Sequence, residues 1–92
     1  MYDVHRSNRF KKSFKRICGS GSFNKKSFEE IVLLLINKIE LPEYLHDHQL
    51  KGNYSGLREC HIKGDCLLIY YFDDEERVVY LIDIGNHANL FE

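Results

Sequence analysis

The sequence predicts an α+β fold, with an N-terminal strand and two helices packed on one face of a mainly antiparallel sheet. Two patterns lead to this class. In the first forty residues, apolar side chains recur at three- and four-residue steps, which is the period of a helix buried along one side. From residue 57 onward, apolar residues form three extended segments joined by short polar turns. Helices followed by a meander of strands are typical of an α+β domain.

Residues 2–6 alternate weakly and are predicted to form the first strand. Asn8 is the expected cap of a first helix, whose basic side chains occupy the side away from the core. The apolar side carries Phe10, Phe14 and Ile17. Residues 18–22, Cys-Gly-Ser-Gly-Ser, end this helix, because glycine readily adopts the left-handed conformation found at helix ends.

A second helix is predicted from about Lys25 to Lys38. Ser27 and Glu30 have the spacing of a capping box, and Asn24 is a competing cap one turn earlier. The helix presents a broad apolar stripe to the core, made of Phe28, Ile31, Val32, Leu35, Ile36 and Ile39. Pro42 marks its end.

Three strands are predicted at residues 57–62, 66–72 and 77–84, because these segments are rich in β-branched and aromatic residues. Residues 63–65 and 73–76 are the turns between them. The segment 66–72 is apolar on both faces, which indicates a central strand.

Composition predicts a single domain spanning residues 1–92, with 43% hydrophobic residues and enough aromatic side chains to fill one core. Cys18, Cys60 and Cys66 are an odd number without a C-x-x-C pair, so reduced thiols and a cytoplasmic protein are expected. The longest apolar run, residues 31–36, is far too short to span a membrane, and no secretory signal is visible.

Charge is divided unevenly along the chain. Residues 1–28 hold eight basic and one acidic side chain, a balance of +7, whereas residues 29–92 hold five basic and thirteen acidic ones, a balance of −8. The basic part is able to meet phosphate or an acidic partner. A solvated helix face explains the same pattern equally well.

Histidines in the last half of the chain indicate acid–base chemistry. Cutting RNA without a metal requires a base for the 2′-hydroxyl, an acid for the leaving oxygen and donors for the phosphorane charge. His46, His48, His61 and His87 are candidates for these roles, and Asp65 is able to orient an imidazole or act as the base. Phe91 is able to stack on an RNA base. Each of these residues also has an ordinary explanation as a surface, turn or packing residue.

A zinc site is the alternative use of these side chains. His46, His48, Cys60 and His61 are ligand types that zinc accepts, but their spacing matches no finger or metalloprotease pattern. Cys60 and His61 also point to opposite faces of one strand. We therefore expect no metal and no other cofactor.

Residues 41–91 carry an ordered series of motifs: Leu-Pro at 41–42, D-H-x-L-x-G at 47–52, R-x-C-H-I at 58–62, D-x-L-L-I-Y at 65–70 and G-x-H-x-x-L-F at 85–91. This series resembles the RelE/ParE superfamily of bacterial toxins, and specifically its YafQ branch. The resemblance implies a metal-independent, ribosome-dependent endoribonuclease that cuts mRNA and arrests translation. It also implies a cognate antitoxin as partner, with operator DNA contacted only through that antitoxin.

The resemblance assigns site residues position by position. His87 is the expected general acid, with Asp65 and either His48 or His61 as base or orienting groups, and Phe91 is the expected C-terminal aromatic. The remaining histidines, His5 and His46, are expected to be bystanders. A basic first helix that contacts ribosomal RNA phosphates includes Lys11, Lys12, Lys15 and Arg16.

Two positions depart from the pattern of this branch. Cys66 stands where relatives usually carry an aromatic, often Trp, and Asp83 stands where they usually carry an arginine. An aspartate there is expected to repel phosphorane charge, and Arg58 or Lys63 is the expected replacement donor. The departures keep two rivals open: a relative that inhibits DNA gyrase by protein contact, and an inactive module that sequesters an antitoxin and represses its operon with it.

Overall fold

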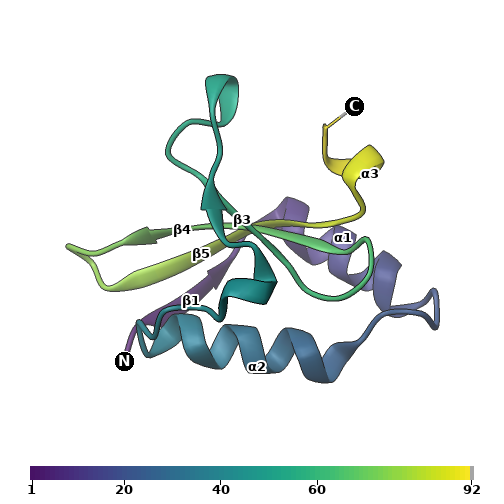
Figure 1. Ribbon diagram of the computed structural model, residues 1–92, viewed down its shortest axis with the longest axis horizontal. Coiled ribbons are helices and arrows are strands. Elements are labelled where there is room, and N and C mark those ends of the chain that lie inside the picture. Colours follow the sequence, from purple (N-terminus) through teal and green to yellow (C-terminus); the bar gives the residue numbers. More distant parts are fainter. Residues whose placement is uncertain (92) are drawn as a thin grey trace.

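The computed structural model describes residues 1–91 and contains a five-stranded sheet in the order β1-β5-β4-β3-β2 (Figure 1). The strands are β1 (Asp3–Arg6), β2 (His48–Gln49), β3 (Arg58–His61), β4 (Leu67–Asp73) and β5 (Val78–Gly85). Only the pairing of β1 with β5 is parallel among these strands. The mainly antiparallel α+β class and the central place of the 66–72 segment are confirmed.

Two helices, α1 (Asn8–Cys18) and α2 (Lys25–Ile36), cover one face of the sheet. Figure 1 shows α2 lying below the strands, with α1 behind it. Their apolar side chains and alternate residues of β4 and β5 form one buried cluster, which includes Phe10, Phe28, Ile31, Leu35, Leu68, Tyr70, Val79, Leu81 and Ile84. No helix within residues 1–91 combines the length and apolar character needed to cross a membrane.

The helix ends correct two details of the sequence prediction. The cap of α1 is Ser7 and not Asn8, because the Phe10 amide donates to Ser7 Oγ at 2.9 Å. For α2 the earlier candidate holds, since Asn24 Oδ1 accepts from the Ser27 amide at 2.9 Å. The helix ends at Ile36 rather than Lys38, whose φ of 54° is left-handed.

An arm made of residues 46–57 connects the helical half to β3 and was not predicted from the sequence. It contains the two-residue strand β2 and the short 3-10 turn Gly52–Tyr54, and it rises above the sheet in Figure 1. The Leu50 amide donates to the Leu57 carbonyl at 2.9 Å and closes the base of the arm. The arm therefore places β2 beside β3 at the edge of the sheet.

A short third helix, α3 (His87–Phe91), also escaped prediction. It rises from the same face of the sheet as the arm, opposite α1 and α2 (Figure 1). Its Leu90 packs with Leu67 and Ile69 in a second buried cluster. The side chain of Asn86 accepts from the Asn89 amide at 2.8 Å, which fixes the start of the helix. The face opposite the two long helices is thus flanked by the arm and by α3.

Candidate active site

A buried carboxylate lies between two histidines on the face of the sheet that carries the arm. His48 of β2 pairs in register with Glu59 of β3, and His61 follows Glu59 by two residues, so all three side chains share this face. Glu59 Oε1 lies 3.4 Å from His48 Nε2 and 3.9 Å from His61 Nε2. The Glu59 side chain is 6% exposed, whereas the imidazoles are 50% and 41% exposed. One buried oxygen therefore lies between two accessible rings, closer to His48 than to His61.

The second ring nitrogen of His48 is also occupied. His48 Nδ1 lies 2.6 Å from the backbone carbonyl oxygen of His46. A carbonyl only accepts, so Nδ1 carries a proton, while Nε2 faces the Glu59 carboxylate, which is also an acceptor when ionised. The His48 ring is therefore held from both sides, by the His46 carbonyl oxygen and by the Glu59 carboxylate.

The structure separates the two histidines that the sequence set aside. The His46 ring meets the His61 ring edge-on, with centroids 5.3 Å apart. The His46 ring thus lies beside His61 and its backbone carbonyl oxygen contacts His48, while its role as a bystander to the chemistry stays a prediction. His5 instead packs on Tyr80, with ring centroids 5.1 Å apart, at the other edge of the sheet.

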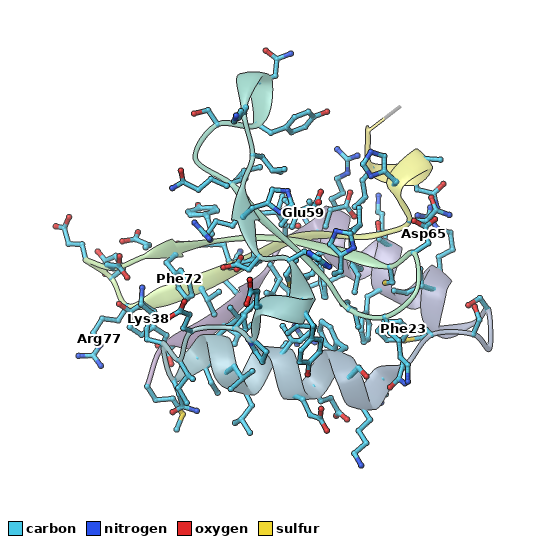
Figure 2. All side chains as sticks on the ribbon, in the orientation of Figure 1. Phe23, Lys38, Glu59, Asp65, Phe72 and Arg77 are labelled. Carbon is cyan, nitrogen blue, oxygen red and sulfur yellow. The ribbon has the colours of Figure 1, made fainter. Side chains whose placement is uncertain are left out.

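Asp65 and His87 approach this cluster from the end of the sheet. His61 pairs with Leu67, and Leu67 pairs with Gly85, so the start of α3 lies two strands, or about 10 Å, from His61. His87 is the first residue of α3 and is exposed. Asp65 is exposed in the turn between β3 and β4, and Figure 2 shows Glu59 and Asp65 on the side of the sheet toward α3. The turn that carries Asp65 and the start of α3, which carries His87, therefore lie near the end of the sheet at which His61 is placed.

Glu59 is the site residue that sequence reasoning missed. The R-x-C-H-I motif leaves position 59 unspecified and points to Cys60 and His61. The two-residue spacing of Glu59 and His61 nevertheless places both side chains on one face of a strand. Sequence alternation gives the face, but not the burial of the carboxylate or its contact with β2. Those follow only from the arm, which brings His48 against it.

Arg58 does not join the histidines. It lies on the opposite face of β3, where its Nε and Nη2 donate to the Asp47 carboxylate at 3.3 and 2.9 Å. The Tyr70 hydroxyl donates to the same carboxylate. Hydrogen bonding to Asp47 raises the pKa of Arg58, and burial together with this bond raises the pKa of Tyr70. The three side chains anchor the arm to β3 and β4, so Arg58 is a poor replacement donor.

Asp83 is buried against α1 and does not stand as an isolated negative charge. It accepts from Ser13 Oγ at 2.6 Å and from the Ile84 amide at 2.8 Å. Arg9 Nε lies 2.7 Å from its other oxygen, and the Arg9 side chain remains 68% exposed. The repulsion expected from the sequence is therefore offset by a guanidinium from α1.

The remaining candidates are distributed over the surface. Within α1, Lys11, Lys12, Lys15 and Arg16 are all exposed, and Lys63 is exposed beside Asp65. Phe91 ends α3, but its side chain lies outside the described residues. Cys60 is buried among the core residues on the helix side, where burial raises the pKa of its thiol to about 12. Within residues 1–91, no group of three or more His, Cys, Asp or Glu side chains is placed to hold a metal ion.

Known proteins match this chain over nearly its whole length. A family model described as a bacterial toxin of type II toxin-antitoxin systems, YafQ, matches residues 2–92. The mRNA interferase toxin YafQ of Escherichia coli strain B is 30% identical over 89 residues, which cover 97% of this chain and 95% of that protein. The chain spans 37% and 64% of the lengths of two other YafQ relatives to which it aligns.

Two solved structures share the fold closely. A metal-bound toxin from Helicobacter pylori is 34% identical and superposes with a TM-score of 0.89, over 99% of this chain and 100% of that one. A chain of the E. coli DinJ–YafQ complex is 29% identical and superposes with a TM-score of 0.85, over 100% of both chains. The arrangement of strands and helices found here is the one these proteins have.

Proposed function

Because the chain belongs to the YafQ family of toxins of bacterial type II toxin–antitoxin systems, we propose that it is a ribosome-dependent endoribonuclease that cleaves mRNA and arrests translation. The observation that carries this proposal is the Glu59 carboxylate between His48 and His61, on the same end of the sheet as Asp65 and His87. A toxin acting only by protein contact has no need of a buried acid between two exposed imidazoles.

The cleavage is an internal transfer within the RNA strand. The 2′-hydroxyl loses its proton to a base and attacks the neighbouring phosphorus, and the bond to the 5′-oxygen breaks as an acid protonates that oxygen. The products are a 2′,3′-cyclic phosphate and a free 5′-hydroxyl, with no other reactant consumed. A paired base and acid and a cation near the phosphorane are what this reaction asks of a protein.

The geometry supports one division of these roles. His61 Nε2 faces Glu59, which leaves Nδ1 to take the 2′-hydroxyl proton, in the same way that a carboxylate orients a catalytic histidine elsewhere. His48 is half-exposed on the other side of Glu59, where it is placed to contact the phosphodiester. His87 is the acid, because it is exposed on α3 across the face from His61. Asp65 is the alternative candidate for the base. Comparing the cleavage rates of Asp65→Asn and His61→Gln shows which of the two residues takes the proton, since loss of the base should cause the larger decrease.

The proposed partners follow from the same family membership. E. coli YafQ has been solved in complex with DinJ. By analogy this chain binds an antitoxin of its own, which neutralises it and carries it to operator DNA. Its substrate is mRNA on the ribosome, and the exposed lysines of α1 contact ribosomal RNA phosphate.

Reconstituted translation tests the proposal. Purified protein is added to ribosomes programmed with a defined mRNA, and to the same mRNA alone, and the new termini are mapped. We expect cuts inside the reading frame only when ribosomes are present, with 5′-hydroxyl ends. Cutting of the free mRNA at the same rate would contradict the proposed dependence on the ribosome. No cutting in either sample would contradict the proposed nuclease activity.

A further inference from the structure

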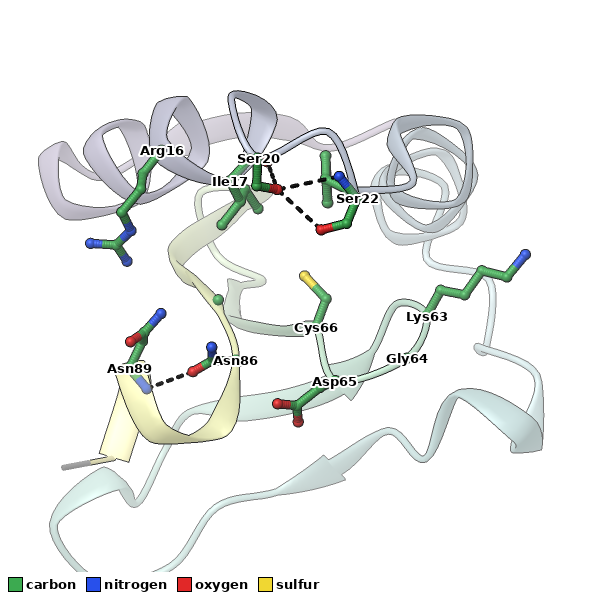
Figure 3. Close-up of a pocket in the computed structure, with 12 residues that line it drawn as sticks. Arg16, Ile17, Ser20, Ser22, Lys63, Gly64, Asp65, Cys66, Asn86 and Asn89 are labelled. Carbon is green, nitrogen blue, oxygen red and sulfur yellow. Dashed lines mark hydrogen bonds between the residues drawn. The ribbon is translucent and has the colours of Figure 1, made fainter.

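A cavity of about 540 Å³ opens beside the proposed active site (Figure 3). Its walls are the last turn of α1 with the loop that follows, the turn between β3 and β4, and the start of α3. Asp65 and Asn86 both line it, and Asn86 directly precedes His87. The cavity therefore has one proposed acid–base residue, Asp65, in its wall and lies next to the start of the helix that carries another, His87. Its volume lies within the usual range for small-molecule sites and suits a single nucleotide rather than a base pair.

The cavity is open because position 66 is small. Cys66 lies half-buried in its wall, with Ile17 and Phe23 as the neighbouring apolar residues. An aromatic side chain at this position would occupy much of the space. Burial raises the pKa of the Cys66 thiol to about 11, so the thiol is neutral near pH 7. This wall is therefore apolar and uncharged, as a surface for a planar ring must be.

Polar groups suited to a nucleotide line the cavity from two sides, Arg16 from α1 and Asn86 and Asn89 from the start of α3 (Figure 3). Asn86 Oδ1 accepts a hydrogen bond from the backbone amide of Asn89, and the Asn86 side-chain nitrogen is left to donate to a ligand. Neither the Asn89 carboxamide nor the Arg16 guanidinium has a hydrogen bond or ion pair to any residue of the described chain, and both are exposed at the cavity. Carboxamides pair with the edges of bases, and a guanidinium binds phosphate with a fork of donors.

We propose that this cavity holds one nucleobase of the RNA strand, next to the phosphodiester that is cut. This inference rests on the proposed function. It adds that the cavity determines at which nucleotides the RNA is cut. The base lies against Cys66 and Phe23, Asn86 and Asn89 read its edge, and Arg16 holds a neighbouring phosphate. RNA is favoured over a peptide because the cavity adjoins Asp65 and because Arg16 continues the exposed basic residues of α1.

Filling the cavity tests the proposal through the choice of cutting site. Cys66→Trp closes the space with the side chain that relatives often carry, and Cys18→Trp places the same bulk on an exposed position outside the cavity. We expect Cys66→Trp to keep cleaving while the relative use of individual sites changes by about tenfold, as for the loss of one base contact. Cys18→Trp should keep the wild-type pattern. An unchanged pattern in a folded Cys66→Trp protein overturns the proposal.

Two exposed substitutions keep the test decisive if Cys66→Trp does not fold. Asn89→Ala should flatten the preference between sites, and Arg16→Ala should slow cutting at all sites by a similar factor. Arg16→Lys should restore only part of the rate, because lysine lacks the forked donor. If these variants cut as the wild type does but escape neutralisation by the antitoxin, the cavity seats a peptide and the proposal is wrong.

A binding measurement separates this inference from the nuclease itself. Nucleoside 5′-monophosphates are titrated into the ¹⁵N-labelled protein without ribosomes, and the side-chain amide signals of Asn86 and Asn89 are followed. We expect millimolar binding that differs among the four nucleotides and disappears in Cys66→Trp. Binding without any RNA cleavage would reject the proposed function while supporting the site. If the protein cleaves RNA but binds no nucleotide, and Cys66→Trp has no effect, the nucleotide site is rejected while the proposed function stands.

Discussion

At the scale of single residues, Glu59 is the group on which the site depends. A buried carboxylate is costly unless it is compensated, and its nearest partners are the Nε2 atoms of His48 and His61. In both rings, Nε2 is the nitrogen that contacts this carboxylate. The three residues therefore act as a unit, and removal of the shared carboxylate should affect both histidines at once.

We expect Glu59→Gln to reduce mRNA cleavage by about 10²-fold while the protein stays folded, because the amide keeps the shape but not the charge. Primer extension measures the cleavage rate, and the far-UV circular dichroism spectrum shows whether the variant is folded. Gln49→Glu is the matched control, since Gln49 is exposed on the neighbouring strand. A Glu59→Gln protein with wild-type activity would remove the carboxylate from the mechanism.

The three cysteines should differ widely in reactivity. Cys18 is exposed and Cys66 half-buried, while Cys60 is buried with its thiol pKa raised to about 12. Since the thiolate is the reactive form, a Cys66 pKa of about 11 leaves about one thiol in a thousand ionised at about pH 8. Iodoacetamide labelling followed by mass spectrometry should modify Cys18 first and Cys66 much later, with Cys60 modified only on unfolding.

The same measurement has a defined pH dependence. Labelling of Cys66 should rise about tenfold per pH unit until its folded pKa is approached. The raised pKa values also mean that the folded state holds its thiols protonated. Their contribution to stability is complete below the ordinary value of 9.0 and is lost as pH rises toward the folded values. Labelling of Cys66 that equals that of Cys18 at about pH 8 would contradict the assigned burial.

At the scale of elements, one carboxylate ties the arm of residues 46–57 to the helix side of the sheet. Asp47 accepts from Arg58 and Tyr70, which project from β3 and β4 on the helix side. Its neighbour His48 projects to the other face. Asp47 is therefore a structural anchor for a catalytic candidate, and its loss should be felt both in stability and in activity.

Asp47→Ala should lower the free energy of unfolding by about 2 kcal/mol, because it leaves the partly buried Tyr70 hydroxyl and Arg58 guanidinium without their acceptor. Urea denaturation gives this value. Asp73→Ala is the control, since Asp73 caps only the exposed turn after β4 through the Glu76 amide. Equal stability of the two variants would show that the anchor is not made by Asp47.

At the scale of the whole molecule, charge and chemistry lie on different parts of the chain. The acid–base residues sit on the face between the arm and α3, and the exposed lysines lie on α1. We therefore propose that the basic surface binds the substrate complex and takes no part in cutting it. A protein that contacts phosphates displaces counterions from the nucleic acid, and this release becomes less favourable as the salt concentration rises. Binding that depends on phosphate contacts therefore weakens with added salt.

We expect Lys11→Ala combined with Lys12→Ala to weaken ribosome binding and to reduce the slope of log affinity against log salt by about 1 to 2. Sedimentation with ribosomes over a salt series measures both quantities. Lys25→Ala combined with Lys26→Ala removes two lysines from the start of α2 and serves as the matched control. The same slope in both double variants would mean that α1 is not the binding surface.

The sequence predicts those parts of the molecule whose pattern is local. The stripe of α2 and the three long strands follow from periodicity, and their bounds differ from the structure by one or two residues. β2 has only two residues, and it forms because Asp47 reaches side chains distant in sequence. The five residues of α3 show no period and depend on Leu90 finding Leu67 and Ile69. Glu59 was missed for the same reason, since its partners come from the arm.

The most direct test of the account is primer extension on a translated message in cells that express either the wild-type chain or His87→Ala. Because His87 is exposed, the variant should fold as the wild type does. The account predicts discrete cuts within the reading frame for the wild type, reduced by about 10²-fold or more in His87→Ala, together with relief of growth arrest. Equal cutting and toxicity by a folded His87→Ala protein would contradict the assigned acid. Toxicity without cuts, accompanied by a DNA-damage response, would contradict the nuclease itself.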